Sequence, residues 1–115
     1  MASKRFIAIY QVPASVLADW AKQEPTSKKA EEEKMMAAWN KWMGDHAKMI
    51  VDTQSGGKTK RITSSGISDF KNDIMLYSII EAETHEEAAK AFADHPHLQI
   101  PQASIEIMEI RPMTA

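Results

Sequence analysis

Apolar and polar residues form four short segments with the pattern of β-strands. The predicted strands are 5–12, 58–63, 74–82 and 104–112. The third is almost continuously apolar, as expected for a central strand covered on both faces, and the last alternates between apolar and polar residues. We expect the stretch 52–57 to be a loop. The polar stretch 64–73 is predicted to be a connection too long for a tight hairpin.

Two long helices and one short helix are predicted between these strands. Thr26 or Ser27 is expected to cap the first long helix, in which apolar residues recur at helical spacing. Those residues are Met35, Trp39, Trp42, Met43 and Met49. The second long helix is predicted over 84–94, because Thr84-His-Glu-Glu87 has the form of a capping box. The short helix is expected over 14–22.

The order strand, helix, strand, strand, helix, strand is the ferredoxin-like βαββαβ pattern. We therefore expect one α+β domain, 1–115, with a four-stranded antiparallel sheet and helices on one face only. Neither side of the predicted strands is fully polar, so the other face of the sheet needs a cover. We expect a homodimer joined through that sheet face. Candidates for the buried surface are Phe6, Tyr10, Tyr77 and Met108.

Composition narrows the possible functions without selecting one. The chain has 115 residues, no cysteine and a formal net charge of −2, with 14 scattered basic side chains. This charge gives little support to a nucleic-acid or membrane partner. The lack of cysteine excludes disulfides and thiol chemistry, and it agrees with a reducing cytoplasm. The apolar run near the start is too short for a signal peptide or a membrane span, so a cytoplasmic protein is expected.

Several segments resemble the YCII-related small bacterial proteins, also called the DGPF family. The similar segments are 58–82, the helix with Glu86-Glu-Ala-Ala89, the run Ile105–Pro112 and the strand 5–12. The resemblance implies a dimeric α/β barrel, in which two ferredoxin-like sheets close face to face. A characterised relative is a lyase that removes chloride from a hydroxymuconate through a histidine–aspartate pair. This chain has no histidine early in its first helix and no Asp-Gly-Pro-Phe sequence.

The candidate catalytic residues lie where the second long helix meets the last strand. Asp94, His95 and His97 surround Pro96 at that point. Histidine suits proton transfer near neutral pH, and Asp94 could orient one of the rings. The alternative is structural, because a histidine at a helix C-terminus complements the helix dipole and a proline stops the helix. We expect one ring to face a pocket and the other to cap the helix.

Three further residues are candidates for contact with a small-molecule ligand. Tyr10 and Tyr77 lie on strands that are neighbours in this fold, and their phenol groups would reach the barrel interior unless they pack in the core. Lys58 belongs to a small basic cluster, which would attract an anionic substrate or line a solvated strand edge. No cofactor and no metal site are expected, because the two histidines have no evident third and fourth ligands nearby.

Two functions of different classes remain open. The first is a cofactor-free lyase or isomerase that moves protons on a small organic acid or ring compound with a histidine and a carboxylate. The second is a non-catalytic homodimer that binds a small ligand or serves as an accessory module. The fold does not decide between them. A roomy pocket with His95 or His97 pointing into it favours the enzyme, and a filled interface with both rings in solvent favours the module.

Overall fold

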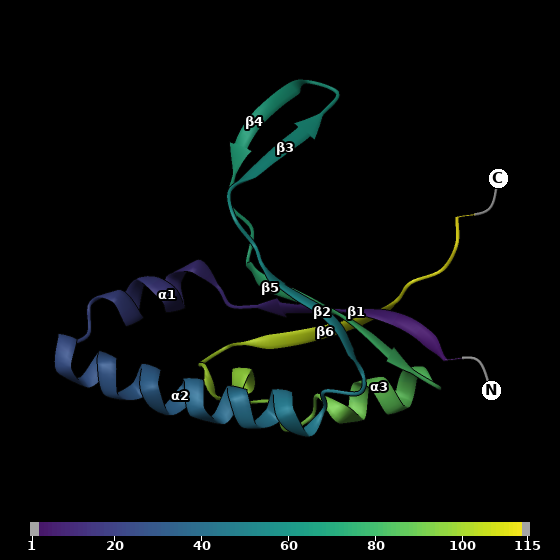
Figure 1. The fold of residues 1–115 in the computed structure, drawn as a ribbon. Helices are drawn as coiled ribbons and strands as arrows, with labels where there is room; N and C mark the ends of the chain where they lie inside the picture. The colour runs from purple at the N-terminus through teal and green to yellow at the C-terminus, as the bar shows by residue number, and fades with distance from the viewer. Residues whose placement is uncertain (1–2, 114–115) are drawn as a thin grey trace.

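The computed structural model describes residues 3–113 and has a four-stranded antiparallel sheet with α2 and α3 packed on one of its faces (Figure 1). The strands are β1 (Lys4–Gln11), β2 (Ile50–Ser55), β3 (Thr59–Thr63), β4 (Gly66–Phe70), β5 (Ile74–Ala82) and β6 (Ser104–Glu109). The helices are α1 (Ala14–Ala21), α2 (Pro25–Asp45), α3 (His85–Ala91) and the 3-10 helix η1 (Pro96–Gln99). The large sheet has the order β2-β5-β1-β6, so the predicted α+β class is confirmed and the topology is compatible with a ferredoxin-like fold.

The second strand of this sheet is not the segment predicted for it. β2, which was expected to be mostly loop, pairs with β5, whereas 58–63 contributes β3 to a separate two-stranded hairpin with β4. The prediction was wrong because four of the six residues of β2 are polar. An edge strand tolerates such a sequence, since its backbone hydrogen bonds to β5 hold it in place.

The stretch 64–73 also differs from its prediction as a long connection. It supplies a two-residue turn, then β4, then a short link to β5. Gly66 opens β4 with φ of 134°, a conformation that a residue with a Cβ rarely adopts. The tight turn was missed because the polar residues of β4 conceal its strand character.

The core lies between α2, α3 and the face of the sheet that they cover. In β1 every second side chain, at Phe6, Ala8 and Tyr10, is completely buried on this face. Trp42 of α2 and Phe92 after α3 pack against the same cluster. Phe6 and Tyr10 are therefore core residues, and their prediction as surface for a subunit interface is wrong. The predicted alternation of side chains along β1 is confirmed. Both faces of the strand are apolar, however, so the sequence does not indicate which one faces the helices.

The opposite face of the sheet also carries apolar side chains. Ile7 and Ile9 of β1 lie beside Ile79 and Tyr77 of β5, and Met108 of β6 lies beside Ile7. These five side chains are called the open-face patch below. They are half-buried, apart from Met108, which is 56% exposed. Two of the four predicted interface residues, Tyr77 and Met108, thus belong to this patch.

Both α2 and α3 begin at a side chain that caps the helix, but the capping residue of α2 differs from the prediction. The Thr84 hydroxyl accepts a hydrogen bond of 3.0 Å from a backbone N–H of the first turn of α3, as predicted. In α2 the cap is Glu24, whose carboxylate accepts from the backbone N–H groups of the predicted caps, Thr26 and Ser27. Pro25 can take the first helical position because it has no N–H to satisfy, so α2 begins earlier than expected.

The Thr84→Ala substitution should lower the free energy of unfolding by about 1 kcal/mol, because it leaves a first-turn N–H of α3 without its partner. Equilibrium urea denaturation measures this. The substitution Glu83→Ala, at an exposed neighbour outside the helix, is the control and should change the stability by less than about 0.5 kcal/mol. Equal effects of the two substitutions would contradict the assignment of the cap.

Candidate functional site

The helix before the two histidines is shorter than predicted. α3 ends at Ala91, and the chain passes through a short turn to His95, which is the N-cap of η1. Nδ1 of His95 accepts a hydrogen bond of 3.0 Å from the backbone N–H of His97. The prediction that a histidine caps the end of the long helix is wrong: His95 caps the start of the next turn. Pro96 suits the first position of that turn because its φ is fixed.

Both imidazole rings lie in the core, with 1% of His95 and none of His97 exposed. The expectation of one inward ring and one capping ring is therefore wrong. It assumed that residues on either side of Pro96 diverge, as in an extended chain, but η1 curls the chain back on itself. Four aromatic residues surround the rings, and the six together are called the aromatic cluster. Its members are Tyr10, Trp39, Trp42, Phe92, His95 and His97.

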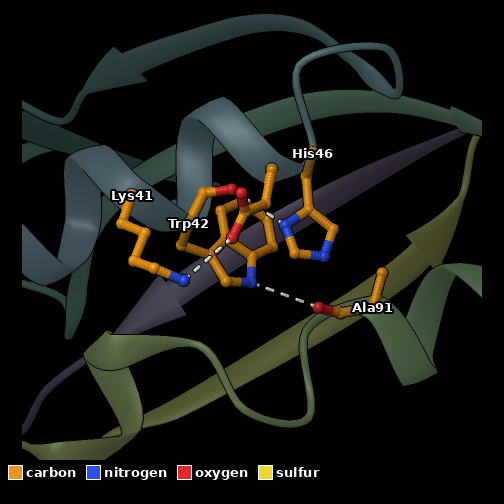
Figure 2. A network of polar contacts seen from close by, with 5 residues as sticks. Lys41, Trp42, His46 and Ala91 are labelled. Carbon is orange, nitrogen blue, oxygen red and sulfur yellow. Dashed lines mark hydrogen bonds and ion pairs between the residues drawn. The ribbon is translucent and has the colours of Figure 1, made fainter.

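Trp42 anchors this cluster between α2 and α3 (Figure 2). Its indole Nε1 donates to the carbonyl of Ala91 at 3.3 Å. Its ring stacks on that of His46 with a centroid distance of 4.2 Å, and Nδ1 of His46 donates to the Trp42 carbonyl at 2.8 Å. The centroid of the His95 ring lies 4.3 Å from that of the Trp42 ring. His46, the C-cap residue of α2, is thus a half-buried, hydrogen-bonded histidine.

Hydrogen bonds fix the protonation of the two buried rings. Because Nδ1 of His95 accepts an N–H, the neutral ring carries its proton on Nε2. Because Nε2 of His97 contacts the carbonyl of Gln11 at 3.0 Å, this nitrogen carries the proton and Nδ1 is an acceptor. Within residues 3–113, neither Nε2 of His95 nor Nδ1 of His97 has a hydrogen-bond partner. The cluster therefore holds one buried donor and one buried acceptor, both unused.

Burial keeps both rings neutral. Burial, with smaller contributions from the neighbouring rings of His97 and His46, lowers the pKa of His95 from 6.5 to about 4. Burial also lowers the pKa of His97, although the carbonyls of Gln11 and Ser104 oppose this. The Gln11 carbonyl accepts a hydrogen bond from Nε2 of the ring at 3.0 Å, whereas Nδ1 has no hydrogen-bond partner within residues 3–113.

Asp94 does not take the role predicted for it. Its side chain is exposed, and it has the smallest of the four influences on the pKa of His95. The ring of His95 is oriented by the backbone N–H of His97 instead. No group of three or more histidine, aspartate or glutamate side chains in residues 3–113 could hold a metal ion.

A cavity of about 770 Å³ lies next to the aromatic cluster, between α1, α2, η1 and the adjoining ends of β2 and β5. We call it the α1–α2 pocket. Its walls are mainly apolar and include Trp20, Met35, Trp39, Leu76 and Ile100. Trp39 is shared with the aromatic cluster, where its ring centroid lies 4.5 Å from that of His95 and 6.2 Å from that of His97. Trp39 therefore stands between the pocket and the two histidines, and neither histidine lines the pocket.

A chain of hydroxyl groups also leads from the pocket into the core. Thr53 lines the pocket, and its hydroxyl lies 2.8 Å from that of Ser78. The Ser78 hydroxyl lies 3.1 Å from the phenol of Tyr10, which the two histidine rings contact edge-on. Burial raises the pKa of Tyr10, so the phenol stays protonated at neutral pH.

The remaining predicted ligand residues lie elsewhere. Tyr77 is in the open-face patch, on the side of the sheet away from the pocket. Lys58 lines a second cavity, of about 740 Å³, at the base of the β3–β4 hairpin, together with Lys71 and Asp73. The structure therefore brings Tyr10, His95 and His97 together but leaves Tyr77, Lys58 and Asp94 apart from them.

Two residues at the pocket were not predicted as site residues. Trp39 belongs to the predicted helical stripe, a pattern that indicates a buried helix face and does not indicate a ligand. Thr53 lies in a stretch expected to be a loop. The polar character of β2 gave no indication that this hydroxyl faces the helices.

No protein-family model matches the chain, and no curated protein matches it either. The resemblance to YCII-related proteins therefore rests on the short segments described above. None of the helices within residues 3–113 is long and apolar enough to cross a membrane.

Protonation of His95 should destabilise the protein in acid. The folded state holds its pKa at about 4, below the ordinary value of 6.5, so the neutral ring contributes stability above pH 6.5 that is lost as the pH falls. By pH 4 the loss should reach roughly 3 kcal/mol. Urea denaturation between pH 7 and pH 4 measures it. His95→Asn retains an acceptor for the His97 N–H and should reduce this pH dependence.

The control is Phe92→Leu, which loosens the same cluster without removing a titrating group. It should lower the stability at every pH and leave the slope against pH unchanged. An equal slope in wild type and His95→Asn would show that the buried ring is not the group responsible.

Proposed function

We propose that the chain is a homodimeric, non-catalytic small-ligand-binding protein of the YCII-related kind, whose ligand occupies the α1–α2 pocket. The observation that carries the proposal is this largely apolar cavity, which has two tryptophan walls and the Thr53 hydroxyl in its lining. Its volume of about 770 Å³ falls within the range of roughly 300–1,000 Å³ typical of small-molecule sites. A few polar groups among apolar walls are the usual composition of such sites.

The pocket favours a neutral or cationic ring compound over an organic acid. Its charged lining residues are Asp19, Glu31 and Glu32, and none of the residues that line it is a lysine, arginine or histidine. A carboxylate ligand would meet like charge there without a partner. Trp20 and Trp39 offer flat apolar surfaces on which a ring can stack.

A lyase or isomerase using His95, His97 and Asp94 has less support. The rings lie behind Trp39, His95 is a weak base with a pKa of about 4, and Asp94 is exposed. One observation keeps this second candidate: both histidine rings, each with a nitrogen that lacks a hydrogen-bond partner within residues 3–113, lie close to Trp39, which lines the pocket. The binding experiment below should therefore include an assay for conversion of the bound compound.

The open-face patch supports the dimeric part of the proposal. Its side chains are apolar, they lie on neighbouring strands, and α2 and α3 cover only the other face (Figure 1). Packing two such faces together would form a dimeric α/β barrel. This arrangement would remove the patch from water, and burial of apolar surface is the main driving force of stable subunit contacts.

The substitution Met35→Arg should weaken ligand binding at least roughly tenfold, because its long charged side chain would occupy the pocket. The probe is N-phenylnaphthylamine, a neutral aromatic dye, titrated with tryptophan fluorescence as the readout. Trp20 and Trp39 line the pocket, so a bound ring should quench them. Ala30→Arg, at an exposed residue of α2 that does not line the pocket, is the matched control and should leave binding unchanged.

Anthracene carboxylate, an anion of similar size, tests the preference for charge. It should bind at least roughly tenfold more weakly than the neutral dye, because the pocket holds three carboxylates. Binding that Met35→Arg does not affect would place the ligand outside the pocket and refute the proposal. Conversion of a bound compound that His97→Asn abolishes would favour the enzyme instead.

The substitution Met108→Asp should dissociate the dimer, because it places a charge in the open-face patch. Sedimentation equilibrium at micromolar concentration measures this, and the dimer dissociation constant should rise at least roughly tenfold. Leu98→Asp, at an exposed apolar residue of η1 on the other side of the molecule, is the control and should have no such effect. A wild-type chain that is monomeric at this concentration would rule out the dimer.

A further inference from the structure

The β3–β4 hairpin stands away from the rest of the molecule, on the side of the sheet opposite α2 and α3 (Figure 1). Every residue of β4 is exposed, and only Thr59 of β3 is half-buried. The radius of gyration is 16.4 Å, whereas a compact domain of this length has a value of about 13 Å. The hairpin is therefore an arm that projects from the side where the open-face patch lies.

The arm exposes apolar side chains that a free hairpin would not be expected to carry. Ile62 and Ile67 are paired across its two strands and are 75% and 72% exposed. Phe70, at its base, is 42% exposed and carries the guanidinium of Arg61 at 4.9 Å from its ring. A two-stranded ribbon is only marginally stable in water, and three or more strands or a packing partner are normally needed. The isoleucine pair offers such a partner an apolar contact.

The arm and the open face of the sheet also carry opposite charge. The segment 58–71 has four basic residues and one acidic residue, a net charge of +3. Among the paired residues of the four strands, the charged side chains on the open face are Asp52, Glu81, Glu106 and Arg5, a net charge of −2. Complementary charges of this kind steer two surfaces together and disfavour other partners.

We propose that the hairpin is a clasp that packs against a second copy of this chain. The inference rests on the proposed dimer and extends it. A partner docked on the open-face patch would occupy the side on which the hairpin projects, so the arm of each copy would flank the other copy. The partner would cover Ile62 and Ile67, and the basic arm would lie beside the acidic side chains around the partner's open face.

The first test removes the apolar contact. The double variant Ile62→Ser/Ile67→Ser should raise the dimer dissociation constant by roughly tenfold or more in sedimentation equilibrium, because two exposed apolar side chains lose their cover. Ser64→Ala/Ser68→Ala changes two exposed residues of the same hairpin without removing an apolar side chain. This control should leave the dissociation constant unchanged.

The second test does not depend on how well the double variant folds. The chain has no cysteine, so Ser65→Cys places a single thiol at the tip of the hairpin, where it can carry a benzophenone maleimide. Irradiation of the dimer should then give a covalent dimer on a denaturing gel. Gly44→Cys, on α2 at the opposite side of the sheet, is the control and should give none.

The outcomes separate the clasp from the dimer itself. A dimer that Met108→Asp dissociates, but that the hairpin double variant leaves intact and Ser65→Cys does not cross-link, would overturn the clasp and retain the sheet interface. A wild-type chain that stays monomeric would overturn both. Loss of affinity in the double variant, together with the covalent dimer, supports the clasp.

Discussion

The structure depends on one buried contact set, the packing of Tyr10 against both histidine rings. Tyr10 comes from the central strand β1, His95 and His97 come from the turn before β6, and Trp39 comes from α2. The Tyr10 phenol is hydrogen-bonded to Ser78 of β5, so Tyr10 links two strands of the sheet to α2 and to the segment that carries Phe92, His95 and His97. A buried polar group in this cluster is costly unless it has a hydrogen-bond partner, and a buried ring is more costly still when it is charged. This cost is the reason that both histidine rings are neutral.

Neutral histidines behind a tryptophan are a poor arrangement for proton transfer at the surface but a suitable support for a tryptophan that lines a binding pocket. The rings supply aromatic area without a charge that would need solvent, and they support Trp39 from behind. Within residues 3–113 this packing leaves one nitrogen of each histidine ring without a hydrogen-bond partner, which is unfavourable because each is a polar atom removed from water. The same features that weaken the case for catalysis by His95 therefore strengthen the case for a rigid apolar site.

The sequence predicted the fold class where pattern and period agree, as in β5, the cap at Thr84 and the helical stripe of α2 from Met35 to Met43. Met49, which was predicted in the same stripe, lies beyond the end of α2 at Asp45. The prediction failed at β2, whose polar side chains conceal an edge strand held by backbone hydrogen bonds, and at β4 for the same reason. Both faces of β1 are apolar, so periodicity could not assign Phe6 and Tyr10 to the core. The pocket could not be predicted from the sequence, because its walls come from α1, α2, η1 and the sheet, which only tertiary packing brings together.

Strand alternation also separates the two functions proposed for the one sheet. Residues of one parity in β1 and β5 meet the helices, support the aromatic cluster and adjoin the pocket, while residues of the other parity form the open-face patch. A ligand and a partner copy would thus approach the sheet from opposite sides, and neither would block the other. The link between them is short, because Ser78, in the hydroxyl chain from the pocket, lies in β5 between Tyr77 and Ile79 of the patch. Tyr10, the next member of this hydroxyl chain, is in turn adjacent to Ile9 of the patch in β1, so the backbones of β5 and β1 both connect the two faces.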